Sequence, residues 1–279
     1  MGTFTIYQGY YDEVSQARLS RDFQPLDIRS YIGNPYFEFS ILRDLHRSSR
    51  PADNAWGLVS SKFGIKTAIT SEEFAAFVGS QLATHDAVFV NPMIFWEAVC
   101  LNVWEQGEIC HPEMIALASR VTGISGLERL VMKRDSFAFC NYFVARNNFW
   151  DAYIDFVNRT VVERFEAGNA DRPLVSALAR TAGHAKNPAA NYVPFVIERL
   201  FSTFVLLNPQ FRVSAFVHPV EIYVKKFGVE LGTMLHAISL VKESIAKFGD
   251  EGHQRFDEFR LAIHKAYGAI NMAALDDPT

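Results

Sequence analysis

The chain is poor in cysteine and has no long hydrophobic run. Its three cysteines, Cys100, Cys110 and Cys140, form no CxxC pair, and their odd number argues against a disulfide framework. They fit a reducing compartment, so we expect a cytoplasmic protein. No stretch of about 18 uncharged apolar residues occurs, so no transmembrane segment is expected. The start of the chain has no basic segment before an apolar run and predicts no signal peptide.

An excess of charge of one sign is also missing. Lys and Arg number 27 and Asp and Glu number 31, which gives a net charge of −4 without a basic stripe. The sequence therefore predicts no nucleic-acid partner. It also lacks a Walker loop and a GxGxxG motif, which argues against standard phosphate-loop and Rossmann enzymes, such as a nucleotide hydrolase.

Apolar and aromatic side chains, in contrast, are abundant. Hydrophobic residues make up 49% of the 279 residues, and 24 residues are Phe. This length suffices for one large domain or for a domain with an appendage, and the composition supplies a sizeable core. The many phenylalanines predict broad packing of helices on a sheet.

Short apolar runs alternate with amphipathic segments. Thr70 and Glu73 form a capping box at the start of one predicted helix. Strand, helix and strand in this order are typical of a parallel βαβ unit. The predicted strands are 3–8, 55–60, 87–90 and 137–145, and the predicted helices are 35–50, 70–83, 148–168 (capped by Asn147) and 190–207, with a further helix starting at His111-Pro112-Glu113.

Residues 208–220 are predicted as a hinge before two amphipathic helices. These helices would pack on the sheet, dimerise, or lie on the inner membrane surface. Packing or homo-oligomerisation is preferred, because Lys225-Lys226 is too small a basic cluster for membrane binding. The predicted division is a sheet domain at 1–207 and a C-terminal helical region at 208–279, with helices at 221–248 and 252–272.

Polar clusters follow three of the predicted strands. In open α/β sheets, ligands bind outside the carboxyl ends of the strands. The sequence therefore predicts a ligand crevice at this edge. The clusters are Gln8 to Asp12, Ser60-Ser61-Lys62 and Asn91-Pro92.

Five short segments resemble a known bacterial family, the glycosyltransferases found in capsule and O-antigen gene clusters. The resemblance spans about residues 3–206 and implies a GT-A-like, mostly parallel central sheet flanked by helices. It also implies a nucleotide-sugar donor and a glycan or lipid-linked glycan acceptor of a bacterial surface polysaccharide, at or near the inner membrane. The segments are AWGLVSSKF (55–63), DAVFVNP (86–92), NVWEQGEICHP (102–112), CNYFVARNNFW (140–150) and PFVIERLF (194–201).

The resemblance implies a donor site at the strand ends. Gln8 and Tyr10 would hold the nucleotide, and Ser60, Lys62 and Asn91 would face the diphosphate and sugar. The plainer interpretations are that Lys62 is a solvated lysine and Asn91 a turn residue before Pro92.

Two polar residues of the later segments are further candidates. Asn141, within an apolar run, would face the ligand. Arg199 would stabilise the leaving diphosphate together with Lys62. Alternatively, Glu198 and Arg199 form a buried structural pair.

An acidic cluster supplies candidates for acid–base chemistry. Glu105 or Glu108 would act as general base on the acceptor hydroxyl, and His111 would bind the acceptor or a phosphate. The alternative for His111 is a structural role at a helix cap.

The sequence departs from the metal-dependent enzymes of this kind. Where many carry Asp-x-Asp to hold a divalent cation (Mg²⁺ or Mn²⁺), this chain reads Val90-Asn91-Pro92. We therefore expect either a transferase without a metal cofactor or a non-catalytic binding or scaffolding module of a polysaccharide assembly complex. Convergence of Lys62, Asn91, Glu105 and His111 in one pocket would favour the enzyme.

Overall fold

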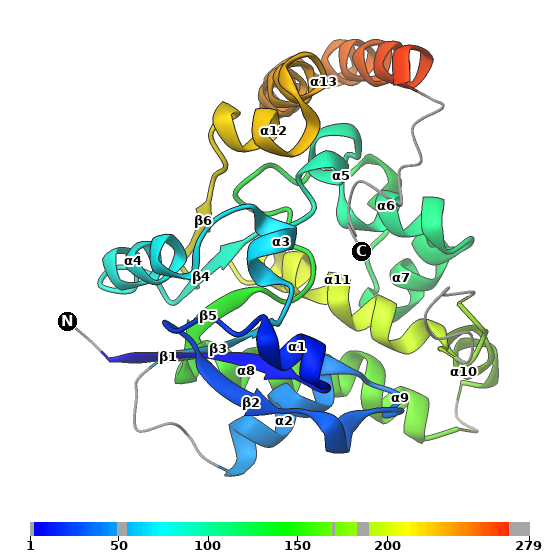
Figure 1. The fold of residues 1–279 in the computed structure, drawn as a ribbon. Helices are drawn as coiled ribbons and strands as arrows, with labels where there is room; N and C mark the ends of the chain where they lie inside the picture. Colours follow the sequence, from blue (N-terminus) through cyan, green and yellow to red (C-terminus); the bar gives the residue numbers. More distant parts are fainter. Residues whose placement is uncertain (1–2, 49–54, 169–170, 183–189, 268–279) are drawn as a thin grey trace.

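One six-stranded sheet forms the centre of the molecule, and helices cover both of its faces (Figure 1). The computed structural model describes residues 3–48, 55–168, 171–182 and 190–267. The strands are β1 (Phe4–Tyr10), β2 (Gln24–Asp27), β3 (Ala55–Ser60), β4 (Ala87–Val90), β5 (Phe143–Arg146) and β6 (Val213–Phe216).

The sheet is mixed, with the strand order β2-β1-β3-β5-β4-β6. β5 runs antiparallel to both of its neighbours, and the other neighbouring pairs are parallel. The prediction of an α/β protein is therefore confirmed. Because β5 is reversed, its first residue lies at the same edge as the carboxyl ends of β1, β3 and β4.

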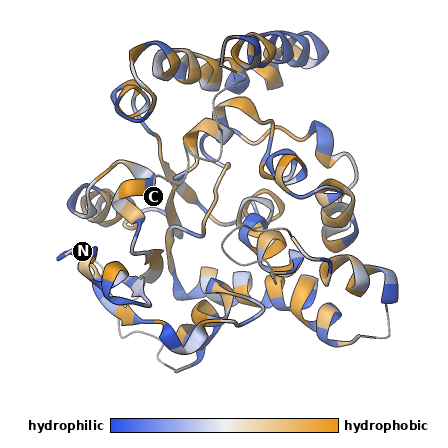
Figure 2. Cartoon of the chain, turned by 45° about the vertical axis from the view of Figure 1, so that its right-hand side comes forward, coloured by the Kyte–Doolittle hydropathy of each residue, from blue (hydrophilic) through white to orange (hydrophobic). Residues whose placement is uncertain are grey.

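The helices carry hydrophobic residues on one side and hydrophilic residues on the other (Figure 2). The α-helices of the described residues are α1 (Glu13–Ala17), α2 (Glu38–Ser48), α3 (Phe63–Thr67), α4 (Ser71–Gln81), α5 (Ile94–Val99), α6 (Val103–Cys110), α7 (Met114–Thr122), α8 (Asn147–Val157), α9 (Glu163–Glu166), α10 (Arg172–Leu178), α11 (Tyr192–Leu207), α12 (Val220–Phe227) and α13 (Val229–Tyr267).

Aromatic side chains fill the space between the sheet and the helices. Trp56 of β3 stacks on Trp150 of α8 with ring centroids 4.1 Å apart, and Phe143 of β5 stacks on Phe201 of α11 at 4.2 Å. Such pairs add to the free energy gained by burying apolar area. The central strands are thereby held rigidly, which fixes the positions of the segments that follow them.

Two predicted elements are confirmed in detail. At the start of α4, the Thr70 hydroxyl accepts a hydrogen bond from the Glu73 N–H, and the Glu73 carboxylate accepts one from the Thr70 N–H, at 3.1 and 2.7 Å. This is the predicted capping box. The apolar run 87–90 forms β4, which is buried along its whole length.

The strand predicted over 137–145 is wrong for its first part. β5 begins only at Phe143. The two residues before Tyr142, Cys140 and Asn141, have φ angles of 61° and 52°, a left-handed conformation that an extended strand does not contain.

Two predicted helix starts are also wrong. The helix expected at His111-Pro112-Glu113 begins at Met114, because Glu113 has a φ of 70°. The side chain of Asn147 does not cap α8; Arg146 precedes the helix and makes no side-chain cap.

The predicted hinge at 208–220 contains a strand. β6 pairs with β4 in parallel, so the division at residues 207/208 separates a strand from its sheet. The helical region that follows consists of α12 and α13. Gly249, with a φ of 53°, kinks α13 near the predicted break.

The C-terminal helices are fastened to the rest of the molecule by a lysine. Lys242 of α13 is 0% exposed, and its ammonium group donates hydrogen bonds to the backbone carbonyls of Glu97 and Cys100 at the end of α5. Burying an ammonium group without hydrogen-bond partners costs much free energy, and these two bonds offset that cost. The described part of α13 therefore packs on the molecule.

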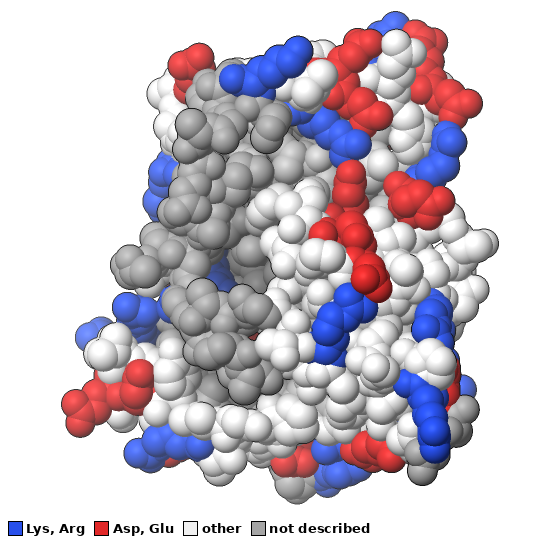
Figure 3. Space-filling model, turned by 90° about the vertical axis from the view of Figure 1, so that its right-hand side faces the viewer, with Lys and Arg blue, Asp and Glu red and all other residues white. Residues whose placement is uncertain are grey.

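No helix among the described residues combines the length and apolarity that crossing a membrane requires. On the face seen in Figure 3, basic and acidic side chains are intermixed. This face therefore has no extended basic surface.

Candidate functional site

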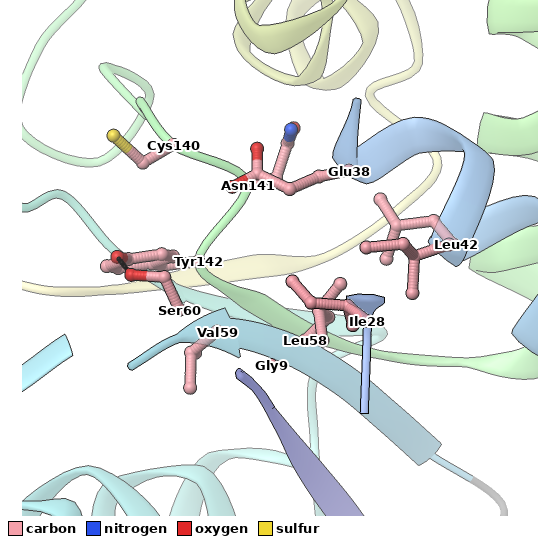
Figure 4. A pocket seen from close by; sticks show the side chains of 11 residues that line it. Gly9, Ile28, Glu38, Leu42, Leu58, Val59, Ser60, Cys140, Asn141 and Tyr142 are labelled. Carbon is pink, nitrogen blue, oxygen red and sulfur yellow. Dashed lines mark hydrogen bonds between the residues drawn. The ribbon is translucent and has the colours of Figure 1, made fainter. Parts of the chain in front are cut away.

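A small pocket lies at the carboxyl edge of the sheet, where Gly9 of β1 is paired with Ser60 of β3 (Figure 4). The segment 140–142 enters it from the start of β5, and α2 closes one side. Its volume is about 30 Å³. One side is apolar, with Ile28, Ile41, Leu42, Leu58 and Val59, and the polar side is formed by Glu38, Ser60, Cys140, Asn141 and Tyr142.

Charged side chains gather around the polar side. Figure 4 shows Glu38 extending from the first turn of α2 toward the segment that carries Asn141. Burial, followed by the negative charge of Glu198, raises the pKa of Glu38 to about 7. Lys66 of α3 acts in the opposite direction on this pKa, but its effect is smaller.

Lys66 provides the cation of this cluster. Its Nζ lies 3.8 Å from Cys140 Sγ. Interactions with the deprotonated forms of Cys140 and Tyr142, and with Glu198 and Glu38, raise the pKa of Lys66 despite its burial, so it stays an ammonium ion at neutral pH.

Two neutral groups complete the polar wall. The Tyr142 hydroxyl forms a hydrogen bond with the Ser60 hydroxyl. Burial raises the pKa values of both Tyr142 and Cys140, so phenol and thiol keep their protons at neutral pH. The wall therefore combines a carboxylate that titrates near neutrality with neutral hydroxyl and thiol groups, and the Lys66 cation lies next to it, beside Cys140.

Strained backbone surrounds the pocket. Among the described residues, five other than glycine have positive φ angles: Cys140 and Asn141 line the pocket, Phe37 precedes Glu38, and Ala68 ends α3, the helix that carries Lys66. Each such residue costs on the order of 1 kcal/mol, and strain of this kind gathers at functional sites. The fifth residue, Glu113, precedes α7.

Asn141 carries an unsatisfied hydrogen-bond acceptor. The residue is 8% exposed, and its side-chain Oδ1 has no hydrogen-bond partner. Buried polar atoms are nearly always paired, with protein, water or ligand. Asn141 Oδ1 is therefore able to accept a hydrogen bond from a ligand in the pocket.

The residues predicted at the first strand have structural contacts. Gln8 is buried, accepts a hydrogen bond from the Ser20 N–H and donates one to the Ser60 carbonyl, at 2.7 and 3.2 Å. Tyr10 ends β1, and its carbonyl accepts a bond from the Ile28 N–H at 2.9 Å. Both residues therefore shape the edge of the pocket without lining it.

The remaining predicted donor-site residues divide between the pocket and its surroundings. Ser60 lines the pocket, whereas Lys62 lies just beyond it, before α3. Asn91 accepts from the Met93 N–H at 3.1 Å, and its amide donates to the Glu97 carboxylate at 3.3 Å. It has the turn role that was the plainer interpretation.

The predicted acid–base residues lie on α6 and just after it, where they hold helices together. Glu105 accepts from the Leu101 N–H and forms an ion pair with Arg260 of α13. Glu108 accepts from the N–H groups of Glu113 and Ile115 at 2.8 and 2.9 Å, and so caps the start of α7.

His111 and Arg199 are buried in the same helical layer. His111 hydrogen-bonds to the Ala182 carbonyl at 3.2 Å. Arg199, 1% exposed, donates to the carbonyls of Val103 and Phe195 and to the side chain of Gln106. The guanidinium is used in packing α11 against α6.

The structure thus brings Ser60 and Asn141 together but does not join Lys62, Asn91, Glu105 and His111 in this pocket. Sequence reasoning missed Glu38, Lys66 and Glu198 as a cluster. Glu198 was considered only as the partner of Arg199 in a buried structural pair, and Glu38 stood in an ordinary amphipathic helix. One local signal for this site was present in the sequence: the polar residue Asn141 stands inside an apolar run, directly after Cys140.

Within the described residues, no group of three or more His, Cys, Asp or Glu side chains is placed to hold a metal ion. Comparisons with protein-family models, with curated proteins and with solved structures find no match to this chain.

Proposed function

We propose that this protein is a glycosyltransferase that moves a sugar from a nucleotide-diphosphate sugar to a hydroxyl group of a bacterial surface glycan. The observation that supports it is the position of Glu38, a half-buried carboxylate at the carboxyl edge of β1 and β3, beside Lys66. This edge is where α/β sheets bind their ligands. A general base works best when its pKa is near the working pH, and that of Glu38 is about 7.

In the proposed reaction, Glu38 takes the proton of the acceptor hydroxyl. The acceptor oxygen forms a bond to the anomeric carbon of the sugar. The bond between that carbon and the diphosphate oxygen breaks, and the nucleoside diphosphate leaves with the electron pair. Lys66, as an ammonium ion, supplies positive charge against the charge that develops on the diphosphate.

The small pocket limits how the donor would lie. A volume of about 30 Å³ admits one small substituent of the substrate. The nucleotide and diphosphate would therefore lie outside it, across the ends of β1 and β3.

A non-catalytic binding module is the second candidate. It is favoured by the hydrogen bonds of Glu105, Glu108 and Arg199, which use these three candidate residues structurally. Both candidate proteins would bind the same nucleotide sugar, but only the transferase would turn it over.

A donor screen tests the proposal. Purified protein is incubated with UDP-, GDP- and dTDP-sugars, and both binding and release of the nucleoside diphosphate are measured. Release that Glu38→Gln abolishes would support the transferase. Binding without release in any acceptor mixture would support the binding module, and absence of both would sink the two together.

A further inference from the structure

The apolar side of the pocket is a slot whose size and lining select its occupant. The whole pocket has a volume of about 30 Å³, which exceeds the roughly 10–15 Å³ that one water molecule needs, so it admits a group of a few heavy atoms. Ile28, Ile41, Leu42 and Leu58 line it. A water molecule needs two to four polar partners, and these four side chains offer none. A methyl group satisfies this lining better than water does.

The polar rim of the slot accepts hydrogen bonds. Asn141 Oδ1 is buried without a partner, and Glu38 contributes a carboxylate near it (Figure 4). Lys66 does not line the pocket, so a phosphate or carboxylate placed against Asn141 Oδ1 would meet an acceptor and the Glu38 carboxylate. The group that fits therefore carries an N–H or O–H donor next to a methyl group.

We propose that this slot binds the acetamido group of an N-acetylated amino sugar, with its N–H donated to Asn141 Oδ1 and its methyl group among Ile28, Ile41, Leu42 and Leu58. The amide is planar and trans, so its N–H and its acetyl methyl lie on the same side. One group thus reaches the unpaired acceptor and the apolar slot together. This inference rests on the proposed function, since it names the class of sugar that the same site takes.

The test compares nucleotide sugars that differ only in this substituent. UDP-N-acetylglucosamine is paired with UDP-glucose, and UDP-N-acetylgalactosamine with UDP-galactose; free N-acetylglucosamine and glucose form a third pair. Dissociation constants are measured by calorimetry, and saturation-transfer NMR reports which ligand protons contact the protein. We expect the acetylated member to bind about 10- to 200-fold more tightly, and its methyl signal to be the most strongly saturated.

Two variants remove the preference by different means. Asn141→Gly deletes the acceptor while suiting the positive φ of 52°. Gly9→Ala places a methyl group 3.0 Å from the end of the Ile28 side chain and so crowds the slot. Both should bring the two members of a pair within about threefold of each other. Glu113→Gly, at a positive φ outside the pocket, is the matched control and should keep the preference.

Thermal unfolding separates the two roles of Asn141. If Asn141 served only the backbone, Asn141→Gly would keep both the melting temperature and the preference. Equal affinity within every pair, or no binding by any of these ligands, would overturn the acetamido assignment. If both members of each pair bound equally but turnover persisted, the acetamido assignment would be wrong and the transferase proposal would stand. If the acetylated sugars bound more tightly but no turnover occurred, the acetamido assignment would stand and the transferase proposal would be contradicted.

Discussion

The ammonium nitrogen of Lys66 lies 3.8 Å from the sulfur of Cys140, which joins α3 to the strained segment before β5. Glu38 and Glu198 both act on the charge of this lysine. Helices α2, α3 and α11, which are far apart in the chain, thus meet at one edge of the sheet through a small set of charged groups.

Replacing Glu38 by Gln should lower kcat by about 10²- to 10⁴-fold, because the amide cannot take the acceptor's proton. The KM for the donor should change less than about threefold, since the side chain remains nearly isosteric. Steady-state kinetics with the best donor of the screen measures both. Glu108→Gln is the matched control: it replaces one of the two oxygens that accept the Glu113 and Ile115 N–H groups, costs about 1 kcal/mol of stability and leaves kcat unchanged. If Glu108→Gln lowered kcat and Glu38→Gln did not, the general base would be Glu108 on α6 and not Glu38.

The pH profile of kcat/KM should rise through about pH 7, as Glu38 loses its proton and becomes a competent base. Two variants should move this limb in opposite directions. Glu198→Gln removes a negative charge that raises the pKa of Glu38, so the limb moves to lower pH. Lys66→Met removes a positive charge that lowers this pKa, so the limb moves to higher pH. If the limb of the kcat/KM profile moved in the same direction in both variants, Glu38 would not be the group whose titration causes it.

The stability of the protein should also depend on Glu38. Its pKa in the folded protein, about 7, exceeds its ordinary value of 4.5, so the folded state binds this proton more tightly than the unfolded state does. The stability contributed by Glu38 is thus complete below about pH 4.5 and is lost as the pH rises through about 7. Urea unfolding should find Glu38→Gln more stable than wild type at pH 8, with the difference shrinking at pH 5. A difference in unfolding free energy between Glu38→Gln and wild type that is the same at pH 5 and pH 8 would contradict this coupling of folding to the protonation of Glu38. The groups that face Glu38 are Glu198, Lys66, Cys140 and Tyr142.

Arg199→Ala should destabilise the protein by about 3–5 kcal/mol, because three buried hydrogen-bond acceptors lose their donor and a large side chain is deleted. Urea denaturation measures this loss. In the fraction that remains folded, the donor KM should be unchanged. A stable variant with a strongly raised KM would restore Arg199 to the diphosphate site.

The sequence predicted well where a local pattern determines the structure. The capping box at Thr70 formed as expected, since it depends on two residues three positions apart. The α/β class followed from apolar runs alternating with amphipathic segments. β6 escaped prediction because Val213–Phe216 is half-buried and owes its strand conformation to pairing with β4.

The candidate site was predicted only in part, for a physical reason. Ser60 and Asn141 stand at ends of apolar runs, and polar residues in such places can be recognised in a sequence. Glu38, Lys66 and Glu198 become a site only through tertiary packing, which no local pattern reveals. Arg199 and Glu108 misled the prediction because a charged side chain that is hydrogen-bonded to backbone groups has the same sequence appearance as a catalytic one.

Where the donor binds can be measured by methyl NMR of isoleucine-labelled protein titrated with the nucleotide sugars of the screen. Ile28 and Ile41 line the pocket, whereas Ile109 and Ile115 lie on α6 and α7 beside the acid–base residues that the sequence favoured. The account predicts shifts at Ile28 and Ile41 with Ile109 and Ile115 unmoved. Shifts at Ile109 and Ile115 alone would contradict a site at the carboxyl edge of the sheet.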